Sequence, residues 1–162
     1  MKNVSMIAAI GKNRELGIDN HLIWHFSEDM KFFKDNTINK NIIMGRNTFE
    51  SLPHLLKNRT HLVLTSKKYD IDGIKVFNSI DEITDYINNN SNLEYMVIGG
   101  ARVYQEFIDL SDSLYITVID DSHIADAYFP VIDNNIWNRR VLSKHNHDNI
   151  NYEHVLYTRK LK

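Results

Sequence analysis

The chain contains no cysteine, so disulfide bonds, thiolate catalysis and cysteine-ligated metals are excluded. It has only two prolines, which indicates that few of its loops are rigid. No apolar run approaches the roughly 20 residues that cross a bilayer. The short apolar run Val4–Ile10 is followed by no small-residue cleavage site, so we interpret it as a central strand and not as a signal peptide. These absences predict a soluble, cytoplasmic protein with no membrane partner.

An excess of charge of one sign is also lacking, since the formal net charge is −2 at pH 7. Lysines and arginines are scattered along the chain and form no basic stripe, which argues against a nucleic-acid partner. The eight histidines include no HExxH pattern, and no nucleophile elbow or Ser-His-Asp spacing is visible. We therefore expect neither a metal site nor a serine-type hydrolase.

The length of 162 residues is typical of one domain, and neither a repeat nor a linker divides the chain, so we predict a single domain over residues 1–162. Up to about residue 107, strand-like apolar runs alternate with helical patterns, which favours a mostly parallel sheet. Later segments are β-rich with no helix between them. The sequence therefore predicts an α/β fold with a mostly parallel central sheet flanked by helices and antiparallel strands at the carboxyl-terminal edge. We expect strands at Val4–Ile10, Asn41–Met44, His61–Thr65, Tyr95–Ile98, Ser113–Ile119, Asn138–Ser143 and Glu153–Lys160, and helices at Glu28–Asn36, Thr48–Leu52, Ile80–Asn88 and Ala101–Ile108.

Three of these strands end in residues that suit phosphate. Arg46 follows a glycine after the second strand, Ser66 and Lys67 follow the third, and Gly99-Gly100 closes the fourth. Ligands bind at the carboxyl ends of the strands in open α/β sheets, so the three signals converge on one crevice. The exits of the second and third strands carry hydroxyls and cations and no acid, which suits the 2′-phosphate of NADP better than the free ribose of NAD.

Asp29 and Arg59 each allow two interpretations. Asp29 either complements the dipole of a helix capped by Ser27, or faces a pocket beside Phe32 and Phe33 and binds a planar group with two N–H donors. Arg59 is either a solvated loop cation or a fixed group that holds a ligand carboxylate. Composition and spacing leave both choices open.

Seven ordered segments resemble the dihydrofolate reductase family over essentially the whole chain. The first is SMIAAIGKNRELGIDNHLIW, with Gly17, Asn20 and Trp24 in matching places. The others are LIWHFSEDMKFFK, IMGRNTFES, the arginine Arg59, VLTS, VIGGARVY and LYITVID.

The resemblance implies NADPH-dependent reduction of 7,8-dihydrofolate to 5,6,7,8-tetrahydrofolate, by hydride transfer and protonation of pterin N5, in support of one-carbon metabolism and thymidylate and purine synthesis. Asp29 would bind the pterin with Thr117 supporting it, Leu22 and Trp24 would close the site, and Arg59 would hold the glutamate carboxylate. Antifolate inhibitors would bind there too, and a monomer is expected. The implied substrate residues are Ile7, Ala8, Asp29, Met30, Phe33, Leu52, Leu56, Arg59, Ile98, Tyr104 and Thr117.

The resemblance also implies where NADPH binds. The nicotinamide half would face Ala9, Leu16, Gly17 and Asn20. The adenosine half and the 2′-phosphate would contact the exits of the second and third strands, and the pyrophosphate would lie on residues 99–105, where the family carries a cis peptide. The remaining implied cofactor residues are Gly45, Arg46, Asn47, Thr48, Leu64, Thr65, Ser66, Lys67, Ile98, Gly99, Gly100, Ala101, Arg102, Val103, Tyr104 and Gln105.

The chain departs from the family pattern at three places. Ile23 and Ser27 stand where the family usually has proline, PHLLKNR replaces GxPLPxR, and ADAYFP replaces GDTxFP. We expect these changes to alter loop motion and not the chemistry. Two alternatives stay open: a related pterin- or pyrimidine-type reductase such as the riboflavin-pathway reductase domain, and a binding module that kept only the nucleotide crevice.

Overall fold

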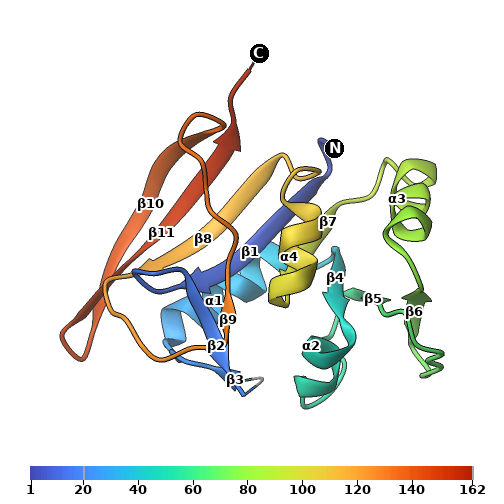
Figure 1. Cartoon of the computed structure of the whole chain (residues 1–162), viewed down its shortest axis with the longest axis horizontal. Coiled ribbons are helices and arrows are strands. Elements are labelled where there is room, and N and C mark those ends of the chain that lie inside the picture. Colours follow the sequence, from blue (N-terminus) through green and yellow to red (C-terminus); the bar gives the residue numbers. More distant parts are fainter. Residues whose placement is uncertain (20, 162) are drawn as a thin grey trace.

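The main sheet of the molecule has eight strands in the order β10-β11-β8-β1-β7-β4-β5-β6, as Figure 1 shows. This computed structural model describes residues 1–19 and 21–161. Parallel pairing joins β8 to β6 through the middle of the sheet, whereas β11 runs antiparallel to both β8 and β10. The predicted fold class is confirmed. The strands are β1 (Val4–Ile10), β4 (Asn41–Gly45), β5 (Thr60–Leu64), β6 (Ile74–Phe77), β7 (Tyr95–Gly99), β8 (Ser113–Ile119), β10 (Trp137–His147) and β11 (Ile150–Arg159).

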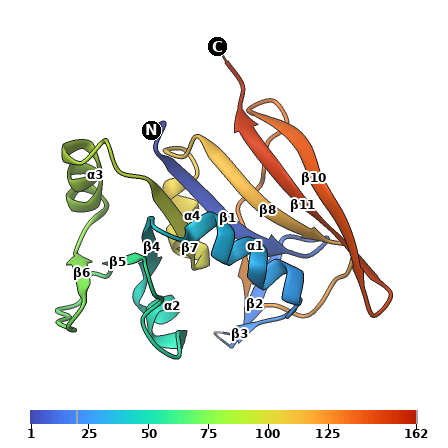
Figure 2. The same ribbon diagram turned by 180° about the vertical axis from the view of Figure 1, so that it is seen from behind.

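Helices cover both faces of this sheet. The helix α4 lies on the face toward the viewer in Figure 1, and α1 lies on the opposite face, which Figure 2 turns to the front. Alternation along β1 explains the two layers, because successive side chains of a strand point to opposite faces. Met6 and Ala8 belong to the core under α4, whereas Ile7 belongs to the core under α1. The helices are α1 (Ser27–Thr37), α2 (Arg46–Ser51), α3 (Ile80–Asn89) and α4 (Ala101–Phe107).

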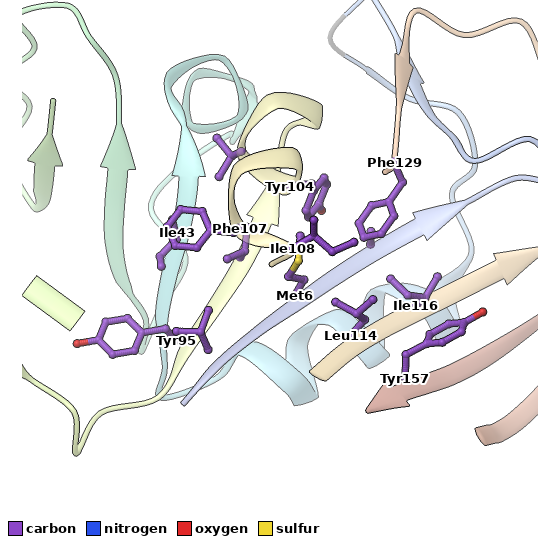
Figure 3. Packing of buried hydrophobic residues seen from close by; sticks show 14 of the residues in the cluster. Met6, Ile43, Tyr95, Tyr104, Phe107, Ile108, Leu114, Ile116, Phe129 and Tyr157 are labelled. Atoms are coloured by element: carbon purple, nitrogen blue, oxygen red, sulfur yellow. The ribbon is translucent and has the colours of Figure 1, made fainter. Parts of the chain in front are cut away.

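The larger core is continuous across the sheet. Figure 3 shows Tyr104 and Phe107 of α4 against Met6 of β1, with Leu114 and Ile116 of β8 beside them. Phe107 and Met6 are fully buried. The burial of these large side chains fixes α4 on the sheet, and with it the loop that joins β7 to α4.

Each predicted helix and strand overlaps an observed one, but four strands were missed. One is β6 at the sheet edge, and the other three form a small second sheet with the order β3-β2-β9. Strands this short contain too few residues to show a period-two pattern. They are β2 (Glu15–Ile18), β3 (His21–Leu22) and β9 (Ala127–Tyr128).

The hairpin of β10 and β11 is longer than predicted. Its turn consists of Asp148 and Asn149, both with positive φ (49° and 66°), as a two-residue type I′ turn requires. The distal half of β10 is largely exposed and polar, so its sequence carries little hydrophobic alternation. The Asp148-Asn149 pair was the one sequence feature that could have predicted a tight turn and therefore the longer strands.

The helix α1 begins without a side-chain cap. Its N-cap residue is Phe26, and Ser27 is already helical, so the interpretation of Ser27 as the cap was wrong. Glu28 and Asp29 occupy the first turn, where a negative charge complements the helix dipole. Asp29 can therefore complement the helix dipole, and this position does not exclude that it also faces a pocket.

Candidate functional site

A cleft of about 830 Å³ opens where the carboxyl ends of β4, β5 and β7 meet the first turns of α2 and α4. The opposite wall comes from β2, β3 and β9 of the small sheet. The strand exits predicted to converge do so here. All the predicted cofactor residues line this cleft except Asn20, which lies outside the described residues, and Gln105, which is exposed on α4. The lining also includes residues that the sequence did not indicate, namely His21, His25, Ser51, Asn78, Ser79, Ile80, Glu106, Asp126 and Ala127.

The loop after β5 presents hydroxyl and ammonium groups to one end of the cleft. Ser66 and Lys67 are exposed, and the Lys67 backbone N–H donates to Thr65 Oγ1 at 3.2 Å. Asn78 holds this loop, since its side-chain amide donates to the carbonyl oxygens of Thr65 at 2.9 Å and Lys67 at 3.2 Å. The loop is therefore shaped before any ligand arrives.

Arg46 lies at the same end of the cleft, at the first position of α2. Its Nη1 is 2.9 Å from Glu50 Oε1, and Tyr69 donates to the other oxygen of Glu50 at 3.2 Å. These contacts fix the guanidinium while a quarter or so of its side chain stays accessible. Lys67 and Arg46 thus offer positive charge to an anionic ligand group.

The junction of β7 and α4 brings backbone close to the cleft. The peptide bond between Gly99 and Gly100 is cis, as the resemblance implies. Gly99 has a φ of 122°, and a Cβ there would lie 3.3 Å from the Tyr104 ring. Tyr104 is itself buried, its hydroxyl donates to the Ile7 carbonyl at 2.6 Å, and burial raises its pKa, so it is a fixed neutral donor. A side chain at position 99 would be strained by this backbone conformation and would crowd the Tyr104 ring.

Asp29 and Thr117 meet on the α1 face of the sheet. The Thr117 hydroxyl donates to Asp29 Oδ1, which joins the first turn of α1 to β8. Thr117 is buried, whereas about a fifth of the Asp29 side chain is exposed. The structure therefore brings together the acid and the hydroxyl that the resemblance pairs.

An apolar cluster connects Asp29's helix to the cleft. We call it the Ile7 cluster: Ile7 and its buried neighbours pack against Phe33 of α1 and against Leu52 and Ile98, and the last two also line the cleft. Two predicted substrate residues differ from this pattern. Met30 is 69% exposed, and Ala8 packs in the core under α4, which leaves its backbone as the part able to contribute. The cluster consists of Ile7, Ile42, Met44, Val63 and Met96 with Phe32, Phe33, Phe49, Leu52, Leu56, Tyr69, Ile74, Ile98 and Tyr115.

Arg59 is tethered and not a freely solvated cation. Its Nε donates to the Lys57 carbonyl at 3.0 Å, and its Nη1 donates to Thr37 Oγ1 at 3.2 Å. Burial lowers the pKa of this guanidinium, although it remains charged. Thr37 and Asp29 are eight residues apart on α1, a separation of about 12 Å along the helix axis. The helix therefore spaces a cation and a carboxylate on one side of the Ile7 cluster.

Residues 15–19 and 21–24, which border the cleft, are hydrogen-bonded to the loop before β9. Asp126 N–H donates to the Gly17 carbonyl at 3.0 Å, and the Asp126 carboxylate accepts from the Asp19 N–H at 3.0 Å. Trp24 donates to Asp121 at 3.1 Å. The ADAYFP departure thus preserves pairing between the two loops. Leu22 is 63% exposed at the rim of the cleft.

Comparison with known proteins agrees with this geometry. The sequence profile described as dihydrofolate reductase matches residues 3–160. The dihydrofolate reductase of Bacillus subtilis is 35% identical over 161 residues, covering 97% of this chain and 95% of that protein. The chain belongs to the dihydrofolate reductase family. The dihydrofolate reductase of Buchnera aphidicola subsp. Acyrthosiphon pisum is 44% identical over 129 residues, 79% of each chain. The structure of dihydrofolate reductase from Enterococcus faecalis complexed with NADP(H) and RAB-propyl superposes with a TM-score of 0.87 at 33% identity, covering 98% of this chain and 96% of that one.

Within this dihydrofolate reductase fold, sequence reasoning missed several polar residues that shape the site. Glu15 is buried, and its two carboxylate oxygens accept from the backbone N–H groups of Asn13 at 2.7 Å and His123 at 2.8 Å. Burial alone would raise the Glu15 pKa, but the N–H donors outweigh burial and lower it. Glu15 thus adds a second clamp between the cleft segment and the β9 loop. Its sequence neighbours, Arg14 and Leu16, gave no signal of this role.

His61 is a buried imidazole that supports the loop carrying Arg59. Its Nε2 accepts from the Leu56 N–H at 3.0 Å. Burial lowers the pKa of His61, and the nearby Arg59 charge lowers it further against an opposing backbone hydrogen bond. The imidazole therefore stays neutral, as the acceptor role of Nε2 requires.

We expect His61 to make the protein less stable in mild acid. Because its pKa is depressed by folding, its contribution to stability is complete above the unfolded value of 6.5 and is lost as the pH falls through the folded pKa. The free energy of unfolding should fall by up to about 1.4 kcal/mol per pH unit in that window. Urea denaturation of the wild type and of His61→Gln at several pH values measures this. Equal pH slopes in the two proteins would contradict the assignment.

No helix in residues 1–19 and 21–161 is long and apolar enough to cross a membrane. The same part of the chain contains no group of three or more His, Asp or Glu side chains placed to hold a metal ion.

Proposed function

We propose that this chain reduces 7,8-dihydrofolate to 5,6,7,8-tetrahydrofolate with a hydride from NADPH. Membership of the dihydrofolate reductase family supports the reaction. The observation that carries the proposal is Asp29, an acid held by Thr117 across the Ile7 cluster from a nucleotide-sized cleft. Such a site can hold a reductant and a flat acceptor side by side.

In this proposal the pterin lies against the Ile7 cluster. The Asp29 carboxylate accepts from the pterin 2-amino group and N3–H, a bidentate match for a planar donor pair. Phe33, Leu52 and Leu56 pack against the rings and the benzoyl group, and Arg59 binds the glutamate carboxylate. The ring carbon next to N5 would accept the hydride from NADPH, which would become NADP⁺, and N5 would take a proton from solvent.

The cofactor would occupy the cleft, with its nicotinamide toward Ala9 and Ile98. The pyrophosphate would approach the Gly99-Gly100 backbone, where the absence of side chains allows close contact. The 2′-phosphate would lie among Arg46, Ser66 and Lys67. The Enterococcus faecalis relative was solved with NADP(H), which supports this assignment.

The finer properties follow the same proposal. We propose a cytoplasmic monomer that also binds antifolate inhibitors at the pterin position. The relative from Enterococcus faecalis was solved with both NADP(H) and RAB-propyl, which supports the binding of a second small molecule together with the cofactor. Size-exclusion chromatography with light scattering measures the oligomeric state.

Steady-state oxidation of NADPH with 7,8-dihydrofolate tests the proposed function. Turnover with dihydrofolate and formation of tetrahydrofolate are the expected results. Tight NADPH binding without turnover would favour a binding module. Reduction of a pyrimidine intermediate of riboflavin synthesis, in place of dihydrofolate, would favour the alternative reductase.

We expect Lys67→Ala to weaken NADPH selectively. Loss of one exposed ammonium near a phosphate should cost about 1 kcal/mol, or roughly a fivefold rise in the KM for NADPH, with the KM for NADH unchanged. Lys68→Ala is the matched control, because Lys68 is the adjacent exposed cation and does not line the cleft. An equal effect on NADPH and NADH would contradict the contact with the 2′-phosphate.

A further inference from the structure

Behind Asp29 lies a buried histidine. His154 is 4% exposed, and its Nε2 is 3.3 Å from Asp29 Oδ1. The register of the sheet puts it there, because His154 pairs directly with Thr117 where β11 runs antiparallel to β8. Directly opposed residues project to the same face, so both side chains reach the carboxylate from the sheet.

The imidazole cannot easily turn away from the acid. Its ring stacks on Phe32 with centroids 3.9 Å apart and planes 10° from parallel. The His145 ring is also close, with its centroid 4.7 Å from that of His154. Within the described residues, Nε2 has no hydrogen-bond partner of good geometry, and Asp29 Oδ1 is the acceptor it faces. Because buried polar atoms without partners are destabilising, this contact is the one that Nε2 can use.

The other ring nitrogen, Nδ1, contacts a serine and, through it, a second histidine. His154 Nδ1 is 3.4 Å from Ser143 Oγ, and Ser143 Oγ is 2.8 Å from His145 Nε2. Ser143 can donate to Nδ1, and Nε2 then carries the proton that faces the acid. The titratable groups around the imidazole are Asp29 and Glu28 on α1, Tyr115 on β8, His145 on β10 and Tyr152 on β11.

We propose that His154 is a positioning residue that donates Nε2–H to Asp29 Oδ1, and that Ser143 and His145 fix its tautomer. Thr117 and His154 then bind the same carboxylate oxygen from the sheet side, and the carboxylate keeps its remaining lone pairs for a ligand. A donor favours the ionised form of an acid. This inference rests on the proposed function for its kinetic consequence, but the 3.3 Å contact between His154 Nε2 and Asp29 Oδ1 on which it is built is present in the protein without substrate.

The kinetic test is the pH dependence of the hydride-transfer rate in single turnover. His154→Phe keeps a flat ring against Phe32 and removes the donor, so the midpoint of the pH–rate profile should move to higher pH by roughly one to two units. His154→Gln, whose amide can donate, should restore part of that shift. His147→Phe is the matched control, because His147 is on the same hairpin but packs on Phe26 and faces Asp148, and its profile should not move.

A second readout needs no substrate. In ¹⁵N spectra of the free wild type, His154 should carry its proton on Nε2, and its signals should change in Asp29→Asn and in Ser143→Ala but not in His147→Phe. A proton on Nδ1 alone would overturn the proposal, even if the variants of His154 failed to fold. So would a His154→Phe enzyme with lower rate or stability but an unmoved pH profile. The expected spectra in a protein without dihydrofolate turnover would instead refute the proposed function and leave the hydrogen bond standing.

Discussion

Replacing Asp29 with asparagine is expected to lower kcat/KM for dihydrofolate by roughly 10-fold to 100-fold or more. The neutral amide loses the charge-assisted hydrogen bonds to the ligand, worth about 1.5–3 kcal/mol each. It also presents an N–H₂ group to the Thr117 hydroxyl or to His154, which faces the same oxygen. Steady-state kinetics of the purified variant, with folding checked by thermal denaturation, measure the loss.

The control for this prediction is Glu28→Gln. Glu28 is the neighbouring carboxylate in the first turn of α1, and it is exposed, so its replacement removes the same charge from the same helix end. Its expected cost is only the dipole interaction, about 0.3–1 kcal/mol of stability, with activity retained. An Asp29→Asn enzyme as active as Glu28→Gln would refute the role of Asp29.

Arg59→Gln is expected to raise the KM for dihydrofolate by roughly 10-fold to 100-fold while the KM for NADPH stays unchanged. The guanidinium is held by Thr37 and the Lys57 carbonyl, so it is oriented before a carboxylate arrives, and a charged hydrogen-bonded pair is worth about 1.5–3 kcal/mol. Glutamine keeps a polar side chain, although a shorter one, and removes the charge.

Two comparisons isolate the carboxylate contact. Lys57→Gln removes an exposed cation from the same loop, and its KM for dihydrofolate should match the wild type. A dihydropterin substrate without the glutamate should be reduced equally by the wild type and by Arg59→Gln. A defect of Arg59→Gln that persists with the truncated substrate would indicate a structural role for the arginine instead.

Those parts of the fold that depend on local pattern were predictable. The apolar run Val4–Ile10 became β1 with the same bounds, and Ser113–Ile119 became β8. The strand exits at Arg46, Lys67 and Gly99 met in one cleft because parallel strands deliver their carboxyl ends to the same edge. At these places an apolar strand is followed directly by turn or phosphate-binding residues, so the local sequence was sufficient to predict the strand and its exit.

The missed parts depend on register between distant segments. His154 is 125 positions from Asp29, and only the pairing of β11 with β8 brings the two together. Asn78 likewise supports Thr65 and Lys67 from the segment after β6, a strand that was not predicted. A histidine or asparagine in such a segment has an ordinary solvated interpretation until the fold supplies its neighbours.

The loop that departs from the family pattern keeps its contacts with the segment beside the cleft. The family's GDTxFP run is changed to ADAYFP, yet Asp126 still bonds Gly17 and Asp19, and Glu15 adds bonds to Asn13 and His123. One backbone bond and the carboxylates of Asp126 and Glu15 carry this pairing.

Transfer of deuterium from labelled NADPH tests the central claim most directly. The wild-type protein is mixed with dihydrofolate and NADPH that carries deuterium at the transferred position of the nicotinamide, and the product is examined by mass spectrometry and NMR. The account predicts tetrahydrofolate with one deuterium on the ring carbon next to N5, together with a primary isotope effect in single turnover. Unchanged dihydrofolate, or a reduced product without deuterium, would contradict direct hydride transfer between the cleft and the Asp29 site.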